Sequence, residues 1–140
     1  MIALDANPVI DVLRGRSVPA SESLKSLLAT SVGIVVPGVI RFEVLQGIRT
    51  QKELRLAERL LLSFDHLTLP SDVEFYERAA RRYRSLRKRG ITIRSSIDTL
   101  IAGYCIETET ELLTSERDFI SFAEHFGPKL VADIPEEGKK

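Results

Sequence analysis

Short apolar runs alternate with longer amphipathic segments along the chain. The apolar runs predict strands at 1–4, 33–36, 67–69, 111–114 and 129–132. The amphipathic segments predict helices at 8–14, 20–30, 38–49, 51–63, 72–89, 96–107 and 117–123. Continuous apolar strands that alternate with helices are typical of a parallel sheet covered on both faces. The pattern therefore predicts an α/β fold, a three-layer α/β/α sandwich with a mainly parallel central sheet.

Several predicted helices carry their own boundary signals. Asn7 followed by Pro8 fits an N-cap and first helical residue, because proline lacks a donor that would be unpaired there. Gly15 is suitably placed to end the same helix. The segments 95–98 and 115–118 both have the Ser-x-x-acid spacing of a capping box. These signals place helix starts near residues 8, 96 and 116.

Length and composition indicate one globular domain. The 140 residues are 44% hydrophobic and 29% charged, with equal numbers of basic and acidic side chains. A single cysteine allows neither an internal disulfide nor a cysteine-based zinc site. The longest apolar run, 32–40, contains Pro37 and is too short to cross a bilayer, and no signal peptide is visible. We expect a cytoplasmic protein with a domain at 1–134 and a solvated tail at 135–140.

Four acidic residues follow or lie near the ends of predicted strands: Asp5, Glu43, Asp98 and Asp118. Functional groups in open parallel sheets gather at the carboxyl ends of the strands. Each acid also has a structural explanation, as a loop acceptor, an exposed helical residue or part of a capping box. If the acids converge, a divalent cation must offset their repulsion. Oxygen ligands suit Mg²⁺ or Mn²⁺, and an acidic site of this kind is equipped for phosphodiester hydrolysis.

Asp98 fits a purely structural role least well. On a helix its neighbours are Ile101, Ala102 and Cys105, so the carboxylate tops an apolar stripe. A carboxylate in such a place is partly buried and needs a cation or hydrogen-bond donors. Other kinds of site have less support, since the sequence has neither a GxxxxGK[ST] nor a GxGxxG motif and no recognisable nucleophile motif.

A run of basic residues is the second candidate site. Eight cations and no acid lie within 78–94: Arg78, Arg81, Arg82, Arg84, Arg87, Lys88, Arg89 and Arg94. Tyr76, Ala79, Ala80, Tyr83 and Leu86 recur at helical spacing and are expected to pack inward, which leaves most cations exposed. Arg81, Arg84 and Lys88 are the candidate contacts to phosphate groups or to an acidic partner. The alternative is a solvated helix face.

Four motifs resemble those of PIN-domain ribonucleases, most closely the VapC-type toxins of toxin–antitoxin pairs. They are Ile-Ala-Leu-Asp-Ala-Asn-Pro-Val-Ile-Asp at 2–11, Phe-Glu-Val-Leu-Gln-Gly at 42–47, Gly-Ile-Thr-Ile-Arg-Ser-Ser-Ile-Asp-Thr-Leu-Ile-Ala at 90–102 and Leu-Leu-Thr-Ser-Glu-Arg-Asp-Phe at 112–119. The third is the most specific. All four occur in the family's order, so the resemblance covers essentially the whole domain.

The resemblance implies a Mg²⁺- or Mn²⁺-dependent endoribonuclease, a homodimer and a cognate antitoxin. Asp5, Glu43, Asp98 and Asp118 would be the catalytic and metal-binding acids, with Asn7, Ser115 and Glu116 in support. Ser115 and Glu116 depart from the family's usual residues, so Glu116 is an alternative to Asp118 as the fourth acid. Two other functions stay open: a PIN-domain RNA-processing nuclease without an antitoxin, and a non-catalytic RNA- or protein-binding module of the same fold.

Overall fold

A four-stranded parallel sheet organises the fold in the computed structural model, which describes residues 1–135. The strands are β1 (Ile2–Leu4), β2 (Ile34–Pro37), β3 (Asp65–Leu67) and β4 (Glu111–Leu113), in the spatial order β3-β2-β1-β4. Ile2 pairs with Ile34 on one side and with Glu111 on the other. β1 and β2 are buried along their whole length, as expected for central strands covered on both faces.

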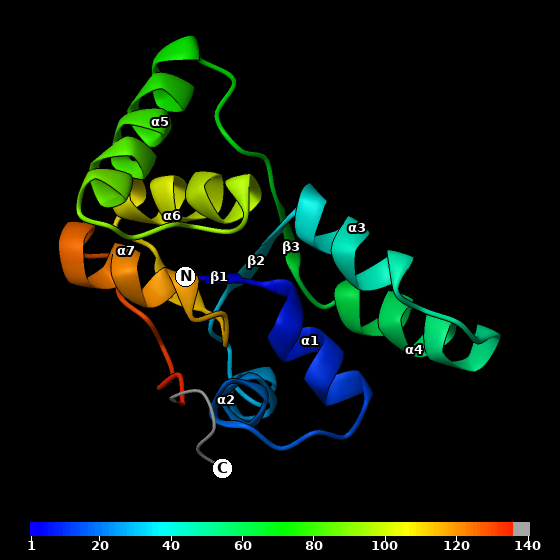
Figure 1. The fold of residues 1–140 in the computed structure, drawn as a ribbon. Helices are drawn as coiled ribbons and strands as arrows, with labels where there is room; N and C mark the ends of the chain where they lie inside the picture. The colour runs from blue at the N-terminus through cyan, green and yellow to red at the C-terminus, as the bar shows by residue number, and fades with distance from the viewer. Residues whose placement is uncertain (136–140) are drawn as a thin grey trace.

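Seven helices form the two outer layers within residues 1–135 (Figure 1). They are α1 (Ala6–Leu13), α2 (Pro19–Leu28), α3 (Gly38–Gln46), α4 (Gln51–Leu61), α5 (Val73–Lys88), α6 (Ser96–Thr108) and α7 (Asp118–Phe126). The first four pack against one another in one layer, and α5, α6 and α7 form the other. The predicted three-layer α/β/α fold is confirmed. None of the described helices combines the length and the apolarity needed to cross a membrane.

The predicted strands differ from the observed ones at the edges of the sheet. The third strand, predicted at 67–69, lies at Asp65–Leu67, where two of its three residues are exposed. An exposed polar strand gives no continuous apolar signal, and its pairing with β2 defines it instead. The predicted strand at 129–132 is reduced to a bridge between Leu112 and Leu130.

The predicted helices agree with the observed ones to within three residues at each end. One predicted N-cap is wrong, because Asp5 rather than Asn7 caps α1 and accepts a hydrogen bond from the Ala6 amide. Pro8 then lies in the first turn, where its missing donor costs no helical hydrogen bond. Ser95 caps α6 as predicted. The predicted capping box at 115–118 does not form, since α7 begins after Arg117 without a side-chain cap.

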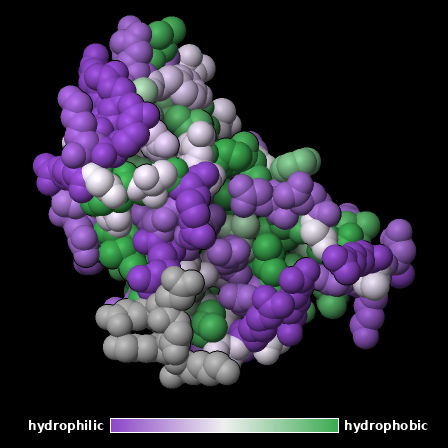
Figure 2. All heavy atoms as spheres, viewed as in Figure 1, coloured by the Kyte–Doolittle hydropathy of each residue, from purple (hydrophilic) through white to green (hydrophobic). Residues whose placement is uncertain are grey.

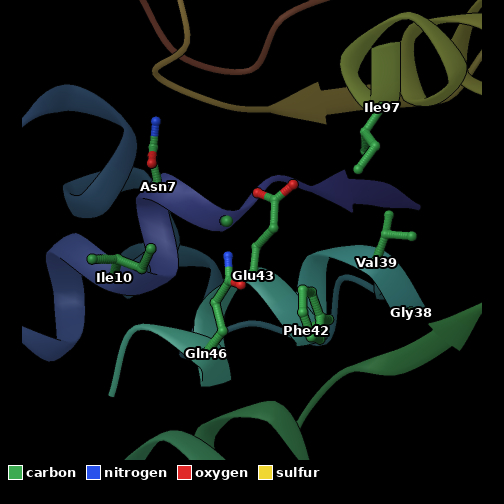
Figure 3. A pocket seen from close by; sticks show the side chains of 9 residues that line it. Asn7, Ile10, Gly38, Val39, Phe42, Glu43, Gln46 and Ile97 are labelled. Carbon is green, nitrogen blue, oxygen red and sulfur yellow. The ribbon is translucent and has the colours of Figure 1, made fainter. Parts of the chain in front are cut away.

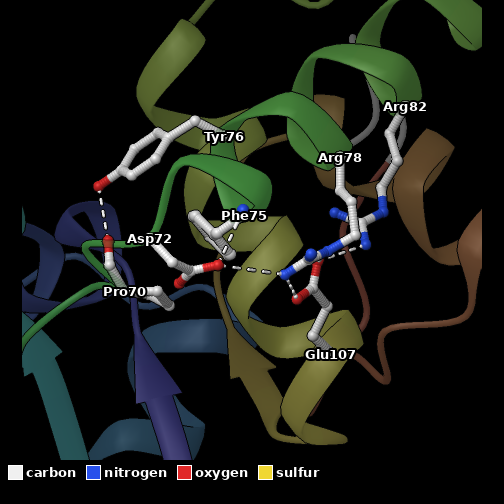
Figure 4. Close-up of polar contacts among 7 residues, drawn as sticks. All are labelled: Pro70, Asp72, Phe75, Tyr76, Arg78, Arg82 and Glu107. Atoms are coloured by element: carbon white, nitrogen blue, oxygen red, sulfur yellow. Dashed lines mark hydrogen bonds and ion pairs between the residues drawn. The ribbon is translucent and has the colours of Figure 1, made fainter.

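A hydrogen-bonded ion cluster joins α5 to α6 (Figure 4). Arg78 and Arg82 on α5 each donate a 2.7 Å hydrogen bond to Glu107 on α6. The two arginines hold the pKa of Glu107 at about 2, well below the usual 4.5. Gly103 permits the close approach of these helices, because a Cβ there would lie 3.1 Å from an Arg82 nitrogen. This cluster fixes the helix that carries Asp98.

The described part of the tail is bound to the domain. The Pro135 carbonyl accepts a 2.9 Å hydrogen bond from Arg117. The rest of the predicted solvated tail lies outside the described residues.

Candidate metal and nucleic-acid site

Asp5 lies at the point where the sheet changes direction. β1 leads into the layer of α1, whereas its neighbour β4 leads into the layer of α7, so a crevice opens at the carboxyl ends of these two strands. The Asp5 side chain is only 4% exposed. Its carboxylate accepts a 2.8 Å hydrogen bond from the Ala6 amide and a 2.6 Å hydrogen bond from the Thr114 hydroxyl. Two strand ends therefore fix this carboxylate.

Asp98 lies in the first turn of α6, and its amide donates to the Ser95 hydroxyl. Ile101, Ala102 and Cys105 below it are fully buried, which confirms the predicted apolar stripe. Burial, together with the charges of Asp5, Glu116, Glu43 and Asp118, raises the pKa of Asp98 from 3.8 to about 7. The protonated form of Asp98 is therefore favoured, first because the side chain is partly buried and then because other acids face it.

Glu43 reaches the same region from α3. The buried face of this helix is formed by Ile40 and Val44, and Arg41 ties the helix to the end of α4 by donating to the Leu61 and Phe64 carbonyl groups. Glu43 is half-buried, and Figure 3 shows its side chain extending from α3 toward the space between α1 and Ile97. Burial and the Asp5 charge raise the pKa of Glu43.

Glu116 and Asp118 differ in their positions. Glu116 lines a pocket together with Asp5, whereas Asp118 is not among the residues that line it. The Asp118 carboxylate accepts a 2.9 Å hydrogen bond from the Arg94 amide. The Arg94 guanidinium in turn donates a 2.8 Å hydrogen bond to Glu116. Arg94 thus bridges the two acids from the loop that precedes α6.

The pocket at the centre of these acids has a volume of about 190 Å³ and is lined by Asp5, Asn7, Glu43, Ser95, Asp98 and Glu116. Within residues 1–135, no group of three or more acid, histidine or cysteine side chains lies close enough together to hold a metal ion as arranged. The donor set nonetheless fits a hard divalent cation, because it consists of carboxylates, and burial together with mutual repulsion raises the pKa values of Asp5, Glu43 and Asp98. A cation here would relieve that repulsion.

Of the predicted supporting residues Asn7 and Ser115, Asn7 lines the pocket and Ser115 does not. Asn7 is exposed, but its side chain makes no hydrogen bond to Asp5. Thr114, to which the sequence motifs assign no role, donates a hydrogen bond to Asp5 and accepts one from the Glu116 amide. The feature of the sequence that could have pointed to Thr114 is its position directly after the Leu-Leu strand.

The basic segment is partly neutralised by acids from outside the run. Glu107 pairs with Arg78 and Arg82, and Glu116 pairs with Arg94. Arg81, Arg84 and Lys88 are exposed and form no salt bridge within the described residues. Hydrophilic side chains gather over α5 at the upper left of Figure 2.

The predicted inward face of α5 is wrong at two positions. Phe75, Ala79 and Leu86 are buried, whereas Tyr76 and Ala80 are exposed. Tyr76 is held at the surface by a 2.8 Å hydrogen bond to the Pro70 carbonyl, also visible in Figure 4. The helix therefore buries a narrower stripe than its apolar residues predict.

Comparison with known sequences identifies the family. Residues 2–125 match the PIN domain. Ribonuclease VapC19 of Mycobacterium tuberculosis is 33% identical over 116 residues, which are 82% of this chain and 88% of that protein. VapC ribonuclease Mb1587 of Mycobacterium bovis is 28% identical over 120 residues, or 85% of this chain and 89% of that protein. The chain belongs to the PIN-domain family.

Solved structures show the same fold. VapBC2 from Rickettsia felis, bound to a DNA fragment from its promoter, matches with a TM-score of 0.70 and 18% identity over 95% of this chain and 100% of that chain. FitAB bound to a DNA fragment matches with a TM-score of 0.66 and 20% identity over 93% of each chain. These similarities support the arrangement of sheet and helices described above.

Proposed function

We propose that this chain is a metal-dependent endoribonuclease that hydrolyses RNA phosphodiester bonds and acts as the toxin of a toxin–antitoxin pair. The observation that carries the proposal is the group of four carboxylates around one pocket at the end of β1, in a PIN-domain chain. The relatives named ribonucleases support the choice of RNA as the substrate.

The acids around the pocket would bind a divalent cation, and neighbouring residues would hold the acids in place. Asp5, Glu43, Asp98 and either Glu116 or Asp118 would hold Mg²⁺ or Mn²⁺. The ion, when bound, supplies Lewis acidity that activates water and offsets charge on the phosphate. Thr114 keeps Asp5 in place through its hydrogen bond. Ser95 accepts a hydrogen bond from the Asp98 amide and so fixes the backbone from which the Asp98 carboxylate extends.

The exposed cations of α5 would guide RNA toward the acids. Arg84 and Arg87 line a groove of about 350 Å³ together with Ser96 and Thr99, which flank Asp98 in the first turn of α6. A phosphate backbone bound by Arg84 in this groove would therefore lie beside the helix turn that carries Asp98, whereas Arg81 and Lys88 do not line the groove and would contact the backbone outside it. Exposed cations bind phosphates without regard to base sequence.

We propose a protein partner and an assembly by analogy with the relatives. The matched structures include complexes named as VapBC and as a toxin–antitoxin complex. A cognate antitoxin that blocks the site and a homodimer of this chain are therefore expected, and the cytoplasm is the expected location. Expression of the chain alone should arrest growth, and co-expression of the neighbouring gene should restore it. Arrest that persists in Asp5→Asn would point to a cause other than RNA cleavage.

One experiment tests the proposed chemistry directly. Purified protein is incubated with total RNA in EDTA and then with added Mg²⁺, and the cut ends are mapped. Cleavage should require Mg²⁺ and should be lost in Asp98→Asn. Asp65→Asn makes the same chemical change at an exposed position on β3 and should cleave normally. Equal cleavage by Asp98→Asn and the native chain would contradict the proposal.

A further inference from the structure

A second, mostly apolar cleft adjoins the acidic pocket. It has a volume of about 560 Å³ and lies between α1, α3 and α6 (Figure 3). Its apolar walls include Ile10 on α1, Phe42 on α3 and Ile97 on α6. Asn7 and Glu43 line both the cleft and the acidic pocket. A molecule bound at the acids therefore has this cleft beside it.

Phe42 is the unusual member of the cleft wall. Its side chain is 65% exposed, although it directly precedes Glu43. The core of α3 is supplied by Ile40 and Val44, so Phe42 does not stabilise the helix by burial. Within residues 1–135 its ring forms no aromatic pair. An exposed aromatic ring at the edge of a cleft is a surface on which a planar group can stack.

Two amide side chains complete the cleft. Asn7 on α1 and Gln46 on α3 are both exposed and line it. Neither amide makes a hydrogen bond to another described residue. Each amide offers both a donor and an acceptor, the combination that recognises the edges of unpaired bases. The cleft thus combines a stacking surface with groups that can read a base edge.

We propose that this cleft binds one nucleobase of the RNA substrate, stacked on Phe42, next to the phosphate held at the acidic pocket. The inference rests on the proposed RNA-cleaving function. A phosphate at the acids necessarily brings the bases of its two flanking nucleotides close by, and the cleft is the apolar space that adjoins the acids. The negative charge of the nearby carboxylates disfavours a second phosphate in the cleft, whereas these carboxylates do not repel a neutral base.

The test measures RNA binding by Phe42 variants in an Asp98→Asn background, which prevents cleavage. The probes are fluorescent oligoadenylate, oligouridylate and a base-free ribose phosphate strand of equal length. Phe42→Leu keeps an apolar side chain but removes the ring, and should weaken binding of the base-containing strands about fivefold or more. Phe42→Trp should restore binding, and the base-free strand should bind all variants equally.

Two controls separate this inference from folding and from the proposed function. Leu62→Ala, at a residue 85% exposed outside the cleft, should leave RNA binding unchanged. Thermal unfolding of Phe42→Leu should match that of the parent chain, because the ring is exposed. If the native chain fails to cleave RNA while Phe42→Leu still loses base-dependent binding, the nuclease proposal falls and the base site stands.

Three results would overturn the base site. Equal binding of all probes by Phe42→Leu and its parent would remove the stacking role. Equal weakening for the base-free strand would show a backbone contact instead. If Phe42→Leu binds RNA as its parent does but no longer binds the protein product of the neighbouring gene, which the parent binds, the cleft is a protein-docking surface.

Discussion

The Thr114 hydroxyl donates a 2.6 Å hydrogen bond to Oδ2 of Asp5, so the residue after β4 holds the residue after β1. Both side chains are buried. Burial raises the pKa of Asp5, and the hydrogen bonds from Thr114 and the Ala6 amide oppose that rise. These two donors therefore favour the charged, metal-binding form of the Asp5 carboxylate, and one of them lies 109 positions away in the sequence.

Removal of the Thr114 hydroxyl should destabilise the fold. Thr114→Val keeps the shape but leaves a buried carboxylate oxygen without this donor, which costs about 1–3 kcal/mol in the free energy of unfolding. Thr114→Ser retains the hydroxyl and should lose much less. Denaturant unfolding at pH 8 measures both. The loss in Thr114→Val should shrink as the pH is lowered, because the pKa of Asp5 is raised and a protonated Asp5 needs the donor less.

Asp98 gives the metal-free protein a characteristic pH dependence. Its pKa is about 7 in the folded state and ordinarily 3.8. Between about pH 4 and pH 7 the folded chain therefore carries a proton on Asp98 that the unfolded chain has released. The free energy of unfolding should therefore rise as the pH falls from about 7 to 4. Since Asp98 is partly solvated, we expect the gain to be about 1–2 kcal/mol rather than the full shift.

Asp98→Asn isolates this contribution. The variant should lack most of the rise in unfolding free energy in EDTA, whereas Asp65→Asn should retain it. Added Mg²⁺ should stabilise the native chain more at pH 8 than at pH 5, because protons and the cation compete for the same carboxylates. An identical pH profile in Asp98→Asn would show that other groups govern the dependence.

The fourth acid can be identified by comparing two amide variants. Glu116 lines the pocket, while Asp118 bonds the Arg94 amide. Asp118→Asn retains an acceptor for that amide and should lower the Mg²⁺-dependent rate about tenfold, as the loss of a supporting group does. Glu116→Gln should lower it more. Initial rates and calorimetric Mg²⁺ binding measure both, and the reverse order would make Asp118 the direct ligand.

The ion cluster of Glu107 with Arg78 and Arg82 should contribute to the free energy of unfolding and should leave the rate of RNA cleavage unchanged. Glu107→Gln removes the charge shared by Arg78 and Arg82, and Arg82 is only 13% exposed. Because Glu107 is exposed, we expect a loss of at most about 1 kcal/mol in the free energy of unfolding at pH 7. Because the pKa of Glu107 is lowered to about 2, the stability it contributes should disappear as the pH falls from about 4.5 to 2. Glu77→Gln, at an exposed acid on α5, is the control.

The sequence reveals the local parts of the site more readily than its long-range contacts. Asp5 follows a buried apolar strand and Asp98 tops an apolar stripe, so both are identifiable from neighbouring residues. Thr114 and Arg94 are not, because their roles depend on partners brought close by the sheet. The predicted N-cap of α1 is wrong because Asp5, the carboxylate at the pocket, also caps the helix. Asn7 therefore lies one residue inside the helix start.

The exposed face of α5 tests function separately from fold. Arg81, Arg84 and Lys88 are exposed, unlike Arg78 and Arg82, which Glu107 holds. The triple variant Arg81→Gln, Arg84→Gln, Lys88→Gln should fold normally, since exposed charges contribute at most about 1 kcal/mol each. If these cations bind phosphates, RNA affinity should fall for all sequences. The dependence of log affinity on log salt should also decrease by about 0.7 for each phosphate that is no longer bound.

A matched variant removes the same charge from another helix. Lys52→Gln, Arg55→Gln, Arg59→Gln changes three exposed cations on α4, so a general effect of net charge would appear equally in both triples. RNA binding against salt concentration and the oligomeric state are measured on the same preparations. Retained RNA affinity with loss of the dimer or of antitoxin binding would assign the α5 cations to a protein interface. If the α5 triple changes neither quantity, these cations form a solvated face, and the RNA must reach the acids by another route.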